Sequence, residues 1–367
     1  MKSLLDRFSE QKKSYYQIDC NAEKLFTYNF EESQSECLEF LNRHYEKGEK
    51  KALFNRDLTP QYNRHGKHTH SASLYLLGTT LLPIFKTNID NRLKSFVPNY
   101  TSWCEDEYDF QYIWFLPAMY HDFASCIELG TIRANDSEQH RSLRFHLGNH
   151  NIQYSPYKPF PYKVDNIPFR FSPELIENYF YYRACRGNYE HGILAGYLFF
   201  DGFVKNFLKN TNGRFNSCGS MNCYGLGWNI GHLAFAAYAA DAIICHNIWL
   251  GGKTEKEEYT QYGLTPLVYT EHPESKLSVE AFPLQFMLCL LDTIEPIKRF
   301  EDTLSPREIL QGIKLDYITN NEIVISWDAI IAQQKGFKRW KKGVVDTKKW
   351  MCVRVADEDD HVRITFY

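Results

Sequence analysis

The sequence lacks several features that would place it in a protein class at once. Its ten cysteines are scattered and none forms a CxxC pair, so neither a zinc ribbon nor a disulfide framework is indicated. No uninterrupted apolar run approaches the roughly 20 residues of a transmembrane helix. The charged N-terminal stretch, residues 1–16, lacks the apolar core of a signal peptide. We therefore expect a soluble, cytoplasmic protein with reduced thiols and no membrane partner.

An excess of positive charge is missing too. A net charge of −3 over 367 residues argues against a general surface for nucleic acid. Internal repeats and low-complexity tracts are also absent. The apolar content of 44% and the charged content of 24% are ordinary for a globular protein, and the length suffices for a large core in one or two domains.

Helical periodicity dominates the chain up to about residue 300. Several segments are apolar around most of the helical circumference, as in core helices. Pro117 lies inside one of them and should kink or break it just before residue 121. The predicted core helices cover residues 71–82, 110–129, 189–208, 228–250 and 279–300.

Two regions have a different character. Residues 131–183 are rich in Pro, Tyr, Phe, Asn, Arg and His, and we interpret this stretch as an ordered insertion, because its aromatic density argues against disorder. The sequence thus predicts a mainly α protein, with a helical domain over 1–300 and a small α+β region over 301–367. In that last region alternating patterns predict strands at 322–328, 348–357 and 361–367, with a short helix at 326–343.

Residues of metal-ligand type interrupt the apolar helical segments. Imidazoles together with carboxylates suit Mn, Fe, Co, Ni or Zn. Their burial is unfavourable unless each group is paired or metal-bound. One such interruption is common, but interruptions in five separate segments are hard to attribute to chance. In chain order the candidate ligands are His70, His121, Asp122, His191, His246 and Asp292.

The adjacent pair His121 and Asp122 matters most, since a carboxylate beside a histidine can bridge two ions while the imidazole holds one. Taken alone, the pair is equally well explained as a buried hydrogen-bonded couple. The order H…HD…H…H…D in a mainly helical chain resembles the HD-domain superfamily of metal-dependent phosphohydrolases. The likeness covers roughly residues 60–300 without the insertion. The segments that carry it are HSASLYLLG, WFLPAMYHDFAS, YEHGILAGY, AIICHN and PLQFMLCLLDTIEPIKR.

This resemblance implies a helical bundle whose ligands point inward onto two divalent metal ions. One ion would be held by His70, His121, Asp122 and Asp292. The second would be held by His191 and His246, with Asp122 bridging. Such a site generates a hydroxide at neutral pH and clamps phosphate oxygens, while basic side chains neutralise the charge that develops. Beside Asp122, the candidate catalytic residues are Arg183, Arg186, Lys298 and Arg299.

One position departs from the family pattern. Many hydrolytic relatives carry a lysine three residues after the aspartate of the pair, where this chain has Ser125. A leaving-group acid or phosphate contact must then come from elsewhere. We expect hydrolysis of a phosphomonoester or phosphodiester in a small, nucleotide-like substrate. The aromatic insertion either stacks on a base, through Tyr154, Tyr157, Phe160 or Tyr162, or is an ordinary packed loop.

Two alternatives stay open. The same ligand order resembles the diiron oxygenases of this superfamily, and the missing lysine is compatible with that reaction. In the other alternative the fold senses a nucleotide without catalysis, and the C-terminal region contacts a partner. The sequence also leaves the oligomeric state open.

Overall fold

The fold is described from a computed structural model of the chain. It describes residues 2–15, 67–97, 107–125, 138–158, 166–188, 190–210, 219–223, 226–228, 230–250, 256–270, 272–300, 302–319 and 321–367.

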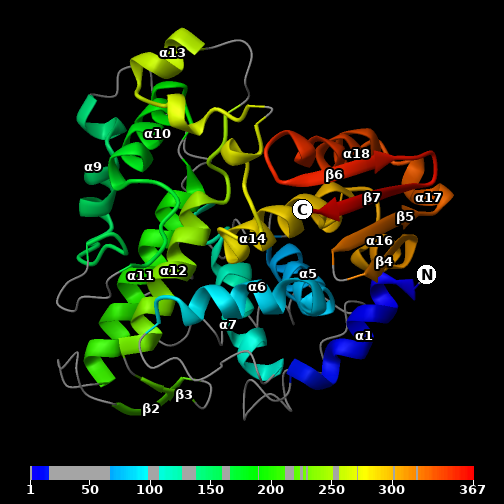
Figure 1. Ribbon diagram of the computed structural model, residues 1–367, viewed down its shortest axis with the longest axis horizontal. Helices are drawn as coiled ribbons and strands as arrows, with labels where there is room; N and C mark the ends of the chain where they lie inside the picture. The colour runs from blue at the N-terminus through cyan, green and yellow to red at the C-terminus, as the bar shows by residue number, and fades with distance from the viewer. Residues whose placement is uncertain are drawn as a thin grey trace.

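Helices make up most of the described chain, and a small sheet is formed largely by its C-terminal part (Figure 1). This confirms the prediction of a mainly α protein with a small C-terminal sheet. None of the described helices is long and apolar enough to span a membrane. The N-terminal helix α1 (Leu4–Tyr15) packs against α5 (Lys67–Thr80) and α16 (Pro306–Gly312). The main helices of the bundle are α5, α6 (Leu82–Lys94), α7 (Glu107–Tyr120), α11 (His191–Asn210), α12 (Ile230–Cys245) and α14 (Pro283–Ile294).

The helix with the proline ends just before residue 121, as Pro117 predicted. α7 continues through Pro117 and stops at Tyr120, and the next residues form a turn in which the backbone N–H of His121 donates to the carbonyl of Pro117 at 3.1 Å. The break is confirmed, whereas helical structure at residues 121–124 of the predicted segment 110–129 is wrong. The turn places His121 and Asp122 at a helix end, where the backbone is free to direct two consecutive side chains inward.

Glycines set the close approach of two helix pairs. A Cβ on Gly78 of α5 would lie 2.1 Å from the ring of Trp114 in α7, and one on Gly196 of α11 would lie 2.7 Å from the carbonyl oxygen of Ala240 in α12. Only a residue without a side chain fits such spacing, because interiors are close-packed. α5 is thus drawn against α7, and α11 against α12.

The expected insertion, residues 131–183, is not a simple loop. It contains η3 (Glu138–Arg141), α9 (Leu143–Asn149) and α10 (Pro173–Cys185). The hydroxyls of Ser142 and Ser172 cap α9 and α10, and Pro173 is the first residue of α10. The sequence prediction relied on the aromatic composition of the segment and did not use these capping residues, so it named no helices here.

Two buried aspartates fix the described part of this insertion to the bundle. Asp201 of α11 accepts the backbone N–H groups of Gln153 and Tyr154 at 2.8 and 3.1 Å. Asp241 of α12 accepts the Tyr157 hydroxyl at 2.7 Å and the backbone N–H of Arg170 at 3.3 Å. These contacts favour the packed-loop interpretation for Tyr157. Phe160 and Tyr162, the other candidates for base stacking, lie outside the described residues.

The sheet in the described part of the chain has five antiparallel strands in the order β1-β4-β5-β7-β6. Strand β1 comes from the N-terminus and pairs Lys2 with Leu315, so residues expected in the helical domain join the C-terminal sheet. β1 and β4 were not predicted, whereas β5, β6 and β7 lie within predicted strands. The strands are β1 (Lys2–Ser3), β4 (Ile313–Thr319), β5 (Glu322–Trp327), β6 (Val353–Asp357) and β7 (His361–Phe366), and β2 (Gly219–Cys223) pairs with β3 (Leu226–Trp228) elsewhere.

The C-terminal helices connect this sheet to the bundle. The predicted helix 326–343 is two helices, α17 (Ala329–Ala332) and α18 (Phe337–Asp346), separated by a turn. The Trp340 indole of α18 donates to the carbonyl of Ile294 at 3.2 Å, at the end of α14. Two further short helices, α15 (Ile297–Phe300) and α16 (Pro306–Gly312), lead from α14 into β4. The division into domains at residue 300 stays a prediction.

Candidate metal centre

The structure brings all six predicted ligands together in the interior. Among the described residues they form two groups, and within each group the ligand atoms lie within 4.8 Å of one another. His191 and Asp292 are half-buried and the other four are buried. The first group consists of His70, His121 and Asp292, and the second group of Asp122, His191 and His246.

Most of the ligands lie at or near helix ends. His121 and Asp122 follow α7, His191 is the first residue of α11, and His246 follows α12. His70 lies in the first turns of α5, and Asp292 in the last turn of α14. Five segments far apart in the sequence thus bring their ligand-type side chains to one point in the interior.

The first group is tightly drawn together. Nε2 of His70 lies 2.9 Å from Oδ1 of Asp292 and 3.3 Å from Nε2 of His121. The His121 nitrogen is 3.5 Å from the same carboxylate oxygen. Three electron-pair donors therefore converge within 3.5 Å.

The hydrogen bonds of the Nδ1 atoms of His121 and His246 show that their Nε2 atoms face the centre. Nδ1 of His121 lies 2.9 Å from the carbonyl oxygen of Ala118, and Nδ1 of His246 lies 2.6 Å from that of Ile243. A carbonyl only accepts, so each Nδ1 carries the proton and, in the neutral ring, Nε2 keeps its lone pair. This is the usual arrangement of metal-binding histidines. The convergence of such lone pairs fits a cation, so the residues present suit a metal site.

Asp122 lies between the two groups. Its Oδ1 is 3.0 Å from Nε2 of His191, while its Oδ2 is 3.5 Å from Nε2 of His121 and 3.8 Å from Nε2 of His70. Each carboxylate oxygen therefore faces a different group. That is the geometry expected of a bridging carboxylate.

Burial and neighbouring charges set the protonation of the ligands. Burial, with His121 and His191 nearby, lowers the pKa of His246 to about 3, so its ring is neutral at pH 7. Burial alone would raise the pKa of Asp292, but Lys298 and the two histidines of its group hold it well below its usual range. A neutral imidazole and an ionised carboxylate are the forms that bind metals.

Glu295 was not singled out from the sequence, and it supports the first group directly. Its Oε2 lies 2.6 Å from Nδ1 of His70, and its Oε1 accepts the Ser73 hydroxyl at 2.6 Å. Burial lowers the pKa of His70, but Glu295 and Asp292 outweigh it and the net shift is upward. The available signal was a carboxylate three residues after Asp292 in the same apolar segment, since such spacing places both on one helix face.

Asn247 is a second residue that sequence reasoning missed. Its side-chain nitrogen lies 3.1 Å from Nε2 of His191 and 2.8 Å from Nε2 of His246. An amide NH2 donates, so both imidazoles accept through the nitrogen that would face a metal. Its position directly after His246 was the available signal.

The four basic candidates lie in different places. Lys298 of α15 contacts Oδ1 of Asp292 and belongs to the centre. Arg299, its neighbour, is exposed. Arg183 of α10 lies 3.7 Å from Glu190, and Arg186 forms an ion pair with Glu258. Ser125, at the position of the family lysine, is buried.

Comparisons with known proteins found no match to this chain. No family model matches the chain, and no curated protein or solved structure matches it. The likeness to HD-domain enzymes thus rests on the five ligand-bearing segments alone, and membership of that superfamily stays a prediction.

Proposed function

We propose that this protein is an HD-type phosphohydrolase that uses two divalent metal ions to hydrolyse a phosphomonoester or phosphodiester. The observation that carries the proposal is the meeting of the two ligand groups at Asp122, whose oxygens face one group each. A single buried His-Asp couple would not require four further ligand-type side chains at the same point. The order of the ligands along the chain supports the same family.

The distances support the ligand assignment that the resemblance implies. His70, His121, Asp122 and Asp292 would hold one ion, and His191 and His246 the other, with Asp122 shared. When bound, the two ions supply an activated water and electrostatic stabilisation of phosphate oxygens. Mn, Fe, Co, Ni and Zn all suit this set of nitrogen and oxygen donors.

Lys298 replaces, in this proposal, the lysine that the family carries at the position of Ser125. Its ammonium contacts Asp292, and its side chain is 15% exposed, so it lies at the border between the centre and solvent. An ammonium group has three donors, and the contact with Asp292 uses one of them. The remaining donors can bind a phosphate oxygen or protonate the leaving group.

Metal content and turnover together test the proposal. Wild type and Asp122→Ala are purified without added metal and analysed by elemental analysis, then reloaded and assayed on a panel of phosphomonoesters, phosphodiesters and nucleotides. We expect about two ions per chain in wild type, a loss of metal in the variant, and turnover that depends on metal. Wild-type protein that binds no metal even after reloading, or that is loaded but inactive on the whole panel, refutes the proposal. Bound iron with oxygen consumption would point instead to the oxygenase alternative.

A further inference from the structure

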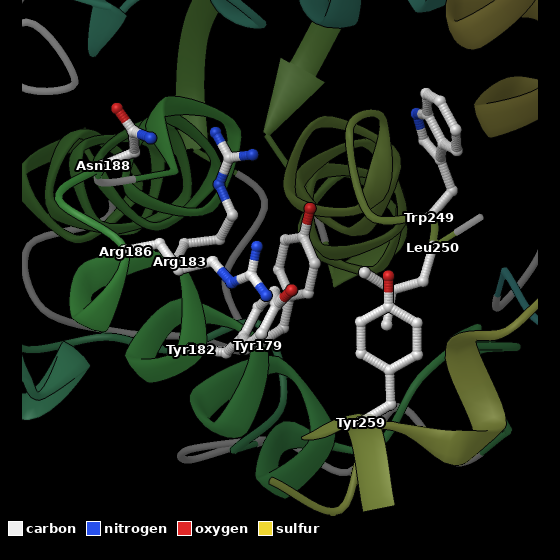
Figure 2. A pocket seen from close by; sticks show the side chains of 8 residues that line it. All are labelled: Tyr179, Tyr182, Arg183, Arg186, Asn188, Trp249, Leu250 and Tyr259. Carbon is white, nitrogen blue, oxygen red and sulfur yellow. The ribbon is translucent and has the colours of Figure 1, made fainter. Parts of the chain in front are cut away.

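A pocket of about 540 Å³ lies beside the second group, between α10 and the chain that follows α12 (Figure 2). A volume of this size suits a small ligand. Figure 2 shows the arginines and Asn188 on one side of the pocket and Trp249 and Tyr259 on the other. Tyr259 belongs to the short helix α13 (Lys256–Gln261). The lining residues are Tyr179, Tyr182, Arg183, Arg186, Asn188, Trp249, Leu250 and Tyr259.

A single residue, Asn247, connects the pocket wall to two of the candidate metal ligands. The hydroxyl of Tyr179 donates to the backbone carbonyl of Asn247 at 3.1 Å. The side chain of Asn247 in turn contacts Nε2 of both His191 and His246. A ligand in the pocket would therefore lie next to the reacting centre, where the part of a substrate that does not react is expected.

Aromatic rings form two sides of this pocket. Trp249 is 44% exposed, although large apolar side chains are usually covered, and Trp350 stacks against it at 5.6 Å with an angle of 6° between the rings. The Tyr182 ring is buried and packs against Arg186, whose guanidinium carbon lies 4.7 Å from its centroid, and against Tyr259, with 5.9 Å between ring centroids. An exposed aromatic ring such as that of Trp249 can bind planar rings by stacking.

The charges in the pocket are balanced. Arg183 lies 3.7 Å from the buried Glu190, and Arg186 is paired with Glu258. Because each guanidinium has a carboxylate partner, the pocket has little net attraction for a second phosphate. Its polar groups instead suit hydrogen bonds to the edge of an uncharged ring.

We propose that this pocket binds the uncharged, planar heteroaromatic ring of a nucleotide-like substrate. Trp249 provides the stacking surface, and Asn188 with the arginines provides hydrogen bonds to the ring edge. The placement of the substrate's phosphate at the metal centre rests on the proposed function, whereas ring binding does not. This also gives Trp350 of the C-terminal region a role, which is to hold Trp249 in position.

Binding of nucleosides to metal-free protein tests the pocket separately from catalysis. Adenosine, guanosine, cytidine and uridine are titrated by calorimetry into wild type, Trp249→Ala, Trp249→Phe and Tyr367→Ala, an exposed aromatic at the C-terminus. We expect at least one nucleoside to bind wild type and Tyr367→Ala equally. Trp249→Ala should weaken binding by about tenfold or more, and Trp249→Phe should largely restore it, because a smaller ring still stacks.

Three results would overturn the ring proposal. The first is that no nucleoside binds wild type, and the second is that Trp249→Ala binds as wild type does. The third is that inorganic phosphate displaces the nucleoside from metal-free protein, since the pocket would then be an anion site. Phosphoester turnover, measured on the same variants after reloading with metal, separates the two proposals. Turnover without nucleoside binding removes the pocket alone, and binding without turnover removes the hydrolase alone.

Discussion

Replacing Glu295 by glutamine tests how the first group is held. Four donors point at the two oxygens of this buried carboxylate: Nδ1 of His70, the Ser73 hydroxyl, and the backbone N–H groups of Ile297 and Lys298. Glutamine has nearly the same shape but offers an NH2 group in place of one oxygen. At least one of the four donors would then face another donor.

The size of the effect follows from which donor is lost. A residue that orients a metal-binding histidine contributes about 10- to 100-fold in metal affinity, which corresponds to about 1.4–2.7 kcal/mol. A buried donor left without an acceptor lowers stability by about 1–3 kcal/mol. We therefore expect Glu295→Gln to bind metal 10- to 100-fold more weakly in the first group and to unfold at lower denaturant concentration.

The assay is calorimetric titration of metal-free wild type and variant with Zn²⁺ and Mn²⁺, with a competing chelator to reach tight affinities. Affinity of the second group should change little, because Glu295 contacts His70 and not the second group's ligands. Glu280→Gln, at an exposed glutamate, is the matched control and should bind as wild type does. If Glu295→Gln binds both ions with wild-type affinity, Glu295 does not orient His70 and the reasoning is refuted.

Three further predictions concern packing, pH and metal removal. In Gly192→Ala the new Cβ would lie 2.7 Å from the His246 ring and 3.0 Å from the carbonyl oxygen of Ile243, so we expect weaker metal binding and a loss of about 1–3 kcal/mol in stability. Gly343→Ala, whose Cβ would meet only Thr293 at an ordinary 4.0 Å, should fold normally. Burial raises the pKa of Asp241 from 3.8 to about 6, so the stability that Asp241 itself contributes is fully present below about pH 4 and is lost as the pH rises to about 6. Relative to Asp241→Asn, wild type should lose about 3 kcal/mol between about pH 4 and pH 7 in urea unfolding, and an unchanged difference contradicts this. Chelation should lower the melting temperature of wild type but not of Asp122→Ala, and equal shifts would contradict the shared ligand.

The apolar pattern of the sequence was enough to find the ligand candidates and five of the main helices, α5, α7, α11, α12 and α14, but not α6. A helix that is apolar around its circumference must be buried, and a histidine or aspartate within it then stands out. For this reason the sequence alone predicts all six candidate ligands, from His70 to Asp292. The alternating pattern at residues 322–328 and 361–367 indicated strands in the same way.

Local patterns failed where a structure depends on distant partners. Strand β1 has only two residues, too few for any periodicity, and it forms because β4 offers it an edge. The cap of α10, Ser172 followed by Pro173, is a helix start signal that the aromatic composition of the insertion outweighed in the prediction. Pro117 correctly indicated a break just before residue 121, but not that residues 121–124 form a turn instead of continuing the helix.

Only the tertiary structure decided what surrounds the ligands. Periodicity reports which face of a helix is buried, not which faces meet. His70 and Glu295 are 225 positions apart, and the approach of α11 to α12 that sets His191 beside His246 depends on glycines whose role appears only in the packed bundle. The same holds for the aromatic pocket, which Tyr182 and Trp249 both line although no sequence motif joins them.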